Sequence, residues 1–244
     1  MPDALSPHDD LHAVDLATVV VVALGHRAAT KAGDHHALVD LVARLTGVDA
    51  ASVTLTQLCP NCGLPGHGPL RVQLGDEADG SPTVHVSLAR ADGRLALAVT
   101  AAGPVGIDLE SVAALARAPL DDVLLSAAEA DAVAALHPRA ATAAVAAVWT
   151  AKEAVLKAAG LGLRVDPRDL TIARETPVAP GGDPAADAAQ PGLAGWPNAP
   201  FLLKELHLMR VATPPEFAAT VAVVCARQPA LRILSPGSEP LDNW

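Results

Sequence analysis

Carboxylate and lysine side chains gather at two places in this sequence, and their types and spacing suit a site for a divalent cation. Asp108 and Glu110 stand two residues apart, and Glu153 and Lys157 follow about forty residues later. Neighbouring carboxylates repel one another, and a hard cation such as Mg²⁺ relieves that repulsion because it prefers oxygen ligands. The alternative is a solvated acidic pair and an ordinary i,i+4 ion pair between Glu153 and Lys157.

The first pair lies in a predicted strand. Residues 105–109 are mostly apolar, and the chain enters them through a proline and a glycine. Successive side chains of a strand point to opposite faces, so Asp108 and Glu110 should share one face, with Ile107 and Leu109 on the other. The strand would therefore hold two carboxylates side by side.

The second pair lies in a predicted helix. Residues 148–163 are rich in Ala, Leu, Lys and Glu, and Gly160 stands where a C-terminal cap glycine belongs. We expect one long helix over 140–159. Glu153 falls at the edge of its apolar stripe, where a carboxylate needs a positive partner. Lys157, one turn later, or a metal ion would meet that need.

In order and spacing, the two motifs resemble those of the 4′-phosphopantetheinyl transferases of the surfactin-synthetase-activating type. That family carries Gly-Ile/Val-Asp-Val/Ile-Glu and Trp-x-x-Lys-Glu-Ser/Ala-x-x-Lys, and this chain reads Gly-Ile-Asp-Leu-Glu and Trp-Thr-Ala-Lys-Glu-Ala-Val-Leu-Lys. The resemblance implies that Asp108, Glu110 and Glu153 bind Mg²⁺, or Mn²⁺ in its place. It also implies that Glu153 is the base and that Lys157 contacts the pyrophosphate of coenzyme A.

The same resemblance implies further contacts to coenzyme A. Arg90 takes the place of a family histidine that touches a phosphate, and an arginine suits that role because it stays charged and bonds bidentately. A solvent-exposed hairpin arginine is the alternative. His35 falls where the family has one of its phosphate-binding arginines. Lys152 and Lys157 complete the expected cofactor-binding set.

The implied activity is transfer of 4′-phosphopantetheine from coenzyme A to a serine of an apo acyl or peptidyl carrier protein, which releases 3′,5′-ADP. The carrier could serve fatty-acid, polyketide or nonribosomal peptide synthesis. A length of 244 residues favours the broad, monomeric type over the short trimeric type. A diverged, non-catalytic module that binds coenzyme A or a carrier protein stays open, because the segment around Arg90 departs from the family pattern.

The family's architecture implies an α+β fold of two similar halves with pseudo-twofold symmetry. Each half would pack a long helix on a small antiparallel sheet, with the active site between the halves. We expect the N-terminal half, with the nucleotide contacts, over 1–102 and the C-terminal half, with the metal motifs, over 103–228. A flexible insert rich in Pro, Gly, Ala and Asp is expected over 176–200, and a tail over 229–244.

Apolar patterning predicts the remaining elements. The expected strands are 15–24, 83–88, 95–100, 170–173, 201–208 and 218–226, and the expected helices are 35–45 and 120–136. Within this last range, Ser126 and Glu129 form a capping-box pattern, which indicates that a helix starts at Ser126.

Composition excludes two classes of protein. The net charge of −10 argues against a nucleic-acid partner, which would need a basic stripe. The apolar run over 16–24 is too short to span a bilayer. No basic residue precedes Arg27, so the positive region of a secretory signal is missing, and we expect a cytoplasmic protein without a membrane partner.

Three further residues have the spacing of half a zinc site. Cys59 and Cys62 bracket a Pro-Asn pair, and His67 follows five residues later. The third cysteine, Cys225, falls in an expected core strand and offers no obvious fourth ligand. A tight turn with reduced thiols is the alternative interpretation.

Overall fold

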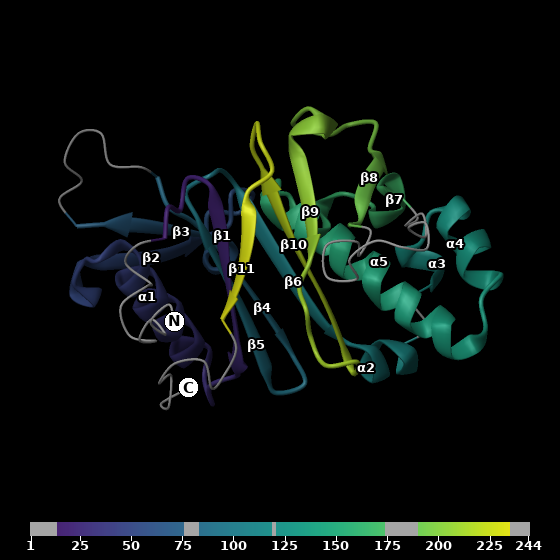
Figure 1. Ribbon diagram of the computed structural model, residues 1–244, viewed down its shortest axis with the longest axis horizontal. Coiled ribbons are helices and arrows are strands. Elements are labelled where there is room, and N and C mark those ends of the chain that lie inside the picture. The colour runs from purple at the N-terminus through teal and green to yellow at the C-terminus, as the bar shows by residue number, and fades with distance from the viewer. Residues whose placement is uncertain (1–13, 76–82, 119–120, 174–189, 235–244) are drawn as a thin grey trace, which may run out of the picture.

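The computed structural model describes residues 14–75, 83–118, 121–173 and 190–234. It has a mixed α+β fold, as the sequence predicted (Figure 1). In chain order, its strands and helices are β1 Val19–His26, α1 Lys31–Thr46, β2 Val53–Leu58, β3 Pro65–Leu74, β4 His85–Ala91, β5 Arg94–Thr100, β6 Val105–Ser111, α2 Val112–Arg117, α3 Asp121–Leu124, α4 Ala127–Ala134, α5 Pro138–Ala158, β7 Thr171–Ala173, β8 Gly192–Gly195, β9 Leu206–Arg210, β10 Phe217–Val224 and β11 Ala230–Leu234.

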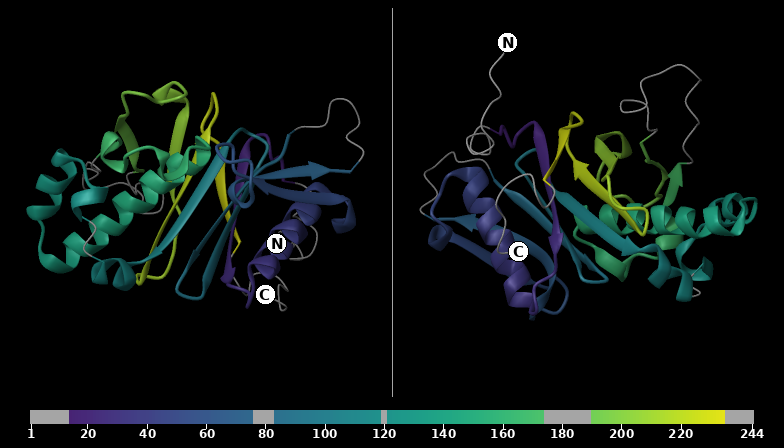
Figure 2. Two further views of the ribbon diagram at one scale, coloured as in Figure 1. Left: turned by 180° about the vertical axis from the view of Figure 1, so that it is seen from behind. Right: turned by 60° about the horizontal axis from the view of Figure 1, so that its bottom comes forward.

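The fold has four layers, helix, sheet, sheet and helix. One sheet has the strand order β11-β1-β5-β4 and the other the order β6-β10-β9. Helix α1 covers the outer face of the first sheet, and α5 covers the outer face of the second (Figures 1 and 2). Two small antiparallel sheets of two strands each, the β2-β3 hairpin and the pair β7-β8, flank these layers. No helix in the described ranges is long and apolar enough to cross a membrane.

Strand β1 shows how the alternation of side chains builds the layers. Val21 and Ala23 pack with α1, whereas Val20 and Val22 pack against the second sheet, and all four are buried. A strand covered on both faces therefore reads as an unbroken apolar run. The first sheet therefore has a hydrophobic core on each of its two faces, one shared with α1 and the other shared with the second sheet.

Glycine at position 106 allows α5 to lie directly on β6. A Cβ atom on Gly106 would be 2.0 Å from the carbonyl oxygen of Ala154 and 2.5 Å from the amide nitrogen of Ala158, both in the backbone of α5. Any side chain here would push the helix away from the strand. Since β6 carries Asp108 and α5 carries Glu153, this glycine sets the spacing between the two parts of the candidate site.

Replacing Gly106 by alanine should destabilise the protein by about 3 kcal/mol, because the clash is with backbone atoms that cannot rotate away. Gly195→Ala is the matched control, since a Cβ atom at Gly195 meets nothing within 4 Å. Chemical denaturation measures both free energies of unfolding. A Gly106→Ala variant as stable as the control would contradict the close approach of α5 to β6.

Several sequence expectations differ from the structure. The helix expected over 120–136 is two helices, α3 and α4, because the backbone is extended at Ser126, whose N–H donates to the Glu129 carboxylate at 2.7 Å where α4 begins. The insert expected over 176–200 includes strand β8, which pairs with β7; its residues 176–189 lie outside the described ranges.

The third difference is at the end of the chain. Part of the tail expected over 229–244 is strand β11, which pairs in parallel with β1 from Val19↔Ala230 to Ala23↔Leu234. The unpaired edge of β1 explains this, because backbone donors and acceptors at a sheet edge can bond an added strand. Residues 235–244 lie outside the described ranges.

The first sheet therefore combines strands of the expected N-terminal half with a strand from the expected tail. Strands β2 and β3 were not expected from the sequence, and the strand expected over 201–208 is β9, which begins only at Leu206.

Candidate active site

The two carboxylates of β6 share one face of the second sheet. Ile107 and Leu109 are buried between the two sheets, as the alternation predicted. Asp108 and Glu110 lie on the opposite face, which α5 covers; Asp108 is 5% exposed, and Glu110 is half-buried. Buried carboxylates in this layer need positive partners.

Helix α5 supplies Lys157 as one such partner. Its Nζ atom donates to Asp108 Oδ1 at 2.6 Å and to the backbone carbonyl of Ile107 at 3.0 Å. The helix ends just beyond, where Gly160 at φ 68° allows the Leu161 amide to close the last turn on Leu156. The sequence left open an i,i+4 ion pair between Glu153 and Lys157 within the helix. In the structure, the Lys157 ammonium instead pairs with Asp108 of β6.

The site is short of positive charge. Burial raises the pKa of Asp108, although the Lys157 ammonium and the Leu109 N–H oppose the rise. Burial, followed by the charge of Asp108, raises the pKa of Glu110. Burial also raises the pKa of Glu153, with Lys157 opposing and Asp108 adding to the rise. Three carboxyl groups therefore favour their protonated forms more than they would in water, and one ammonium does not offset this.

The donor set suits a hard divalent cation. Asp108 Oδ2 is buried and has no hydrogen-bond partner, so one carboxylate oxygen is left for another ligand. The oxygens of Asp108, Glu110 and Glu153 do not form a closed cage, because the described residues place no three carboxylate oxygens within 4.8 Å of one another. Mg²⁺ tolerates such an open set, since it keeps several of its waters and binds proteins through one or two carboxylates.

Trp149 positions Glu110, a role that the sequence reasoning missed. The indole Nε1 donates to Glu110 Oε1 at 3.2 Å. Trp149 is the first residue of the second motif, and its indole N–H was the available signal, because a buried indole N–H usually finds an acceptor. Glu110 is thereby held toward α5 rather than toward solvent.

Mg²⁺ should raise the melting temperature of the protein, and more so at pH about 8 than at pH about 5.5, because the ligands must be deprotonated to bind it. The raised carboxyl pKa values set the sign for the metal-free protein. Its stability should fall as pH rises above the ordinary values of 3.8 and 4.5 and through the raised values. Melting curves with EDTA and with Mg²⁺ at both pH values measure this. Equal stabilisation of wild type and Asp108→Asn would show that Mg²⁺ binds elsewhere.

A second cluster, of basic side chains around Asp34, lies at the start of α1. Asp34 is fully buried; its Oδ1 accepts the Ala28 N–H at 2.7 Å, and its Oδ2 accepts Arg90 Nε. Arg27 Nε lies 3.8 Å from the same Oδ2. Burial, followed by Lys31 and Arg90, lowers the pKa of His35. Positive charge therefore gathers around one carboxylate.

Arg90 has capacity for a further acceptor. Its Nη2 atom is buried and has no hydrogen-bond partner, and the N-terminus of α1 adds its partial positive charge. An anion such as a phosphate group suits these donors. Sequence reasoning singled out Arg90 and His35 but missed Asp34, whose place in the first turn of a helix was the available signal.

Lys152 does not point to a ligand-accessible surface, which corrects the sequence expectation. It is fully buried, and its Nζ donates to the Leu124 carbonyl at 2.7 Å and to the Glu129 carboxylate. Glu129 also accepts the backbone N–H groups of Ser126 and Ile172. Lys152 therefore joins α5 to α4 and β7, and it is unsuited to binding coenzyme A.

The two cysteines and the histidine that have the spacing of half a zinc site come together in the β2-β3 hairpin. One donor atom each from Cys59, Cys62 and His67 lies within 4.8 Å of the other two. Cys225 is in a different part of the fold, next to β10. This cluster and the carboxylate cluster of β6 and α5 are separate sites.

Part of the chain matches a known family. Residues 104–189 match the sequence model of the 4′-phosphopantetheinyl transferase superfamily. The matched segment is about a third of the chain and contains β6 and α5, and so all four residues of the carboxylate and lysine cluster. No curated protein matches the chain.

Among solved structures, a holo-(acyl-carrier-protein) synthase from Bacillus anthracis str. Ames, in complex with CoA (3′,5′-ADP), is similar to half of this chain. The identity is 23% and the TM-score 0.39, and the alignment covers 50% of this chain and 94% of that chain. A likeness of this strength carries no argument about function.

Proposed function

We propose that this protein is a 4′-phosphopantetheinyl transferase of the surfactin-synthetase-activating type, with coenzyme A as donor and an apo acyl or peptidyl carrier protein as acceptor. The observation that carries the proposal is the Asp108–Lys157 pair beside Glu110 and Glu153, inside the segment that matches the superfamily. The match supports phosphopantetheine transfer in general. The subfamily, the carrier and the Mg²⁺ dependence are our extension of it.

In the proposed reaction, the serine oxygen of the carrier forms a bond to the β-phosphorus of coenzyme A. The bond from that phosphorus to the bridging oxygen breaks, and 3′,5′-ADP leaves. Bound Mg²⁺, held by Asp108 with Glu110 and Glu153, would neutralise charge on the phosphates. Such chemistry depends on positioning and electrostatics more than on covalent catalysis by the protein.

Lys157 and Glu153 have distinct roles in this proposal. Two of the three N–H groups of Lys157 Nζ donate to Asp108 and to the Ile107 carbonyl. The third would donate to the pyrophosphate. Glu153 accepts the proton of the carrier serine, directly or through a water molecule.

The experiment that tests the proposal is incubation of the protein with coenzyme A, Mg²⁺ and a panel of apo carrier proteins, followed by intact mass of each carrier. A gain of one phosphopantetheine group on a serine is the expected result. Binding of coenzyme A without any turnover across the panel would favour the non-catalytic binding module instead. No binding of coenzyme A would overturn both.

Arg90→Ala should raise the KM for coenzyme A by about 10- to 100-fold, because charged hydrogen bonds to a phosphate contribute ~1.5–3 kcal/mol. Steady-state kinetics with coenzyme A and with its 3′-dephospho form measure this loss and identify the phosphate. Arg168→Ala is the matched control, since Arg168 also pairs with an aspartate but is exposed. An unchanged KM in folded Arg90→Ala would show that Arg90 does not bind a phosphate of coenzyme A and only pairs with Asp34.

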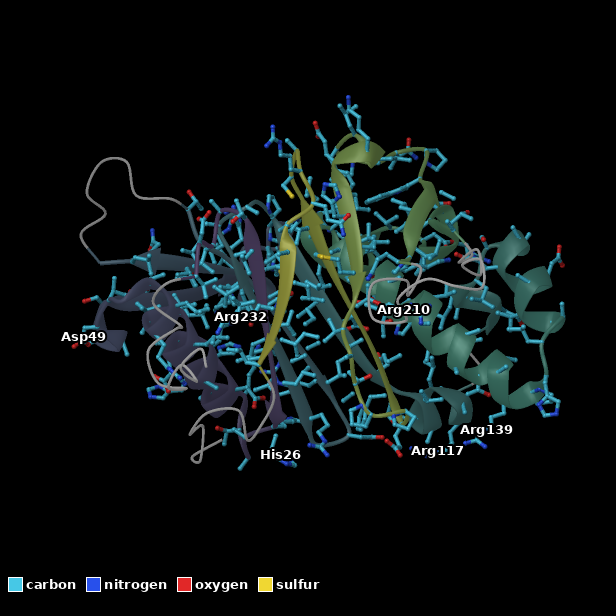
Figure 3. All side chains as sticks on the ribbon, viewed as in Figure 1. His26, Asp49, Arg117, Arg139, Arg210 and Arg232 are labelled. Atoms are coloured by element: carbon cyan, nitrogen blue, oxygen red, sulfur yellow. The ribbon has the colours of Figure 1, made fainter. Side chains whose placement is uncertain are left out.

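Two features of the architecture remain proposals. We propose that the halves over 1–102 and 103–228 are related by pseudo-twofold symmetry and that the substrate cleft lies between them. We further propose a monomer, whose carrier contacts include the exposed Arg117 and Arg139. Figure 3 shows these two side chains projecting at the end of α2 and the start of α5.

A further inference from the structure

The tip of the β2-β3 hairpin is folded as a compact loop around two thiols. The Cys59 N–H donates to the Leu64 carbonyl at 3.0 Å, and the Gly63 N–H donates to the Cys59 carbonyl at 2.9 Å. Gly63 has φ 70°, a conformation that favours glycine. These contacts reverse the chain within five residues, so that Cys62 returns toward Cys59.

The opposite side of the hairpin brings an imidazole to the same loop. His67 Nε2 lies 3.2 Å from Cys62 Sγ. Gly68 passes so close to the other strand that a Cβ atom on it would be 2.7 Å from the Leu58 carbonyl oxygen and 2.8 Å from Cys59 Cα. A glycine with φ 96° thus allows His67 to sit directly beside the two sulfurs.

We propose that Cys59, Cys62 and His67 form a three-ligand site for Zn²⁺, with water in the fourth position. Two ligands each ~2.3 Å from a tetrahedral ion lie ~3.8 Å apart, and the three donor atoms already lie within 4.8 Å of one another. Two thiolates and an imidazole favour zinc over the hard cation expected at the carboxylates. Cys62 and His67 are exposed, so an ion and a water have access.

The site has a structural consequence for the hairpin. Residues 60–68 are all exposed, so packing does little to hold the tip in place. Lys31 Nζ in α1 donates to the Gly66 carbonyl and to Gln57 Oε1, and Gln57 Nε2 donates to the Gly68 carbonyl. A bound ion would order the tip and, through Lys31, the first turn of α1, because metal binding free energy adds to folding free energy.

The test is the zinc content of the full-length protein, purified under reducing conditions without chelator. We expect about one zinc per chain in the wild type, and a loss of at least about tenfold in both Cys62→Ser and His67→Ala. Cys225→Ser is the matched control, since Cys225 is the one cysteine outside the cluster; it should keep its zinc. Asp108→Asn should keep it too, which separates this site from the carboxylates.

Cobalt titration gives a second measurement that does not depend on metal acquired during expression. Co²⁺ added to metal-free wild type should produce thiolate-to-cobalt absorption, and this band should be lost in folded Cys62→Ser, as judged by circular dichroism. Wild type without zinc and without this band would overturn the proposal. A Cys59–Cys62 disulfide in the reduced preparation, or full zinc content in Cys62→Ser, would overturn it as well.

Discussion

Asp108→Asn should reduce phosphopantetheine transfer by about 1000-fold while the protein stays folded. The change removes the charge of Asp108, the most buried of the three carboxylates of the site, whose Oδ2 has no hydrogen-bond partner. It also weakens the hold on Lys157, which the proposed reaction needs at the pyrophosphate. Loss of several kcal/mol of charge stabilisation in the transition state corresponds to roughly this factor.

The measurement is kcat/KM for carrier modification at saturating coenzyme A and Mg²⁺. Asp166→Asn is the matched control, because Asp166 is an exposed aspartate that also pairs with a basic side chain; it should keep wild-type activity. Glu153→Gln should be about as damaging as Asp108→Asn, since it removes a ligand charge and the proposed base together. Near-normal turnover in Asp108→Asn would show that Asp108 takes no part in the chemistry.

Lys152→Met should lower the free energy of unfolding by about 3–5 kcal/mol, the largest stability effect that we expect. The substitution leaves the Glu129 carboxylate buried without its ammonium partner, and an uncompensated buried charge is strongly destabilising. Chemical denaturation measures it. Arg168→Ala removes one partner of an exposed pair and should cost at most about 1 kcal/mol.

The double variant Lys152→Met with Glu129→Gln should recover part of the loss, because no unpaired charge then remains in the core. Below the melting temperature, folded Lys152→Met should keep the wild-type KM for coenzyme A. An unchanged KM would show that Lys152 acts inside the core and does not bind coenzyme A, the contact that the resemblance implied. A raised KM with unchanged stability would restore Lys152 to the ligand surface.

Local spacing was sufficient to predict the elements of the candidate site. A period of two placed Asp108 and Glu110 on one face of β6, and the cap glycine at position 160 marked the end of α5. These features follow from bond geometry and from steric limits on backbone angles, which act over a few residues. The capping-box pattern of Ser126 and Glu129 likewise predicted a helix start at Ser126, which is the N-cap residue of α4.

Only the tertiary structure decided which side chains meet. The sequence offered Glu153 as an ion-pair partner of Lys157, whereas the docking of α5 on β6 through Gly106 brings Lys157 to Asp108 instead. It likewise placed Lys152 inside the core, opposite Glu129. Helix periodicity leaves such choices open, because it states which face of a helix is buried but not what covers that face.

Pairings between distant segments were the least predictable part. Nothing in the sequence around Asp34 indicates Arg90, 56 residues later, and strand β11 joins β1 from the far end of the chain. The Cys59–Cys62 spacing was visible, but the approach of His67 depends on a hairpin whose strands were not expected. Spacing along the chain is set by covalent geometry, whereas contacts between segments depend on the packing free energy of the whole fold.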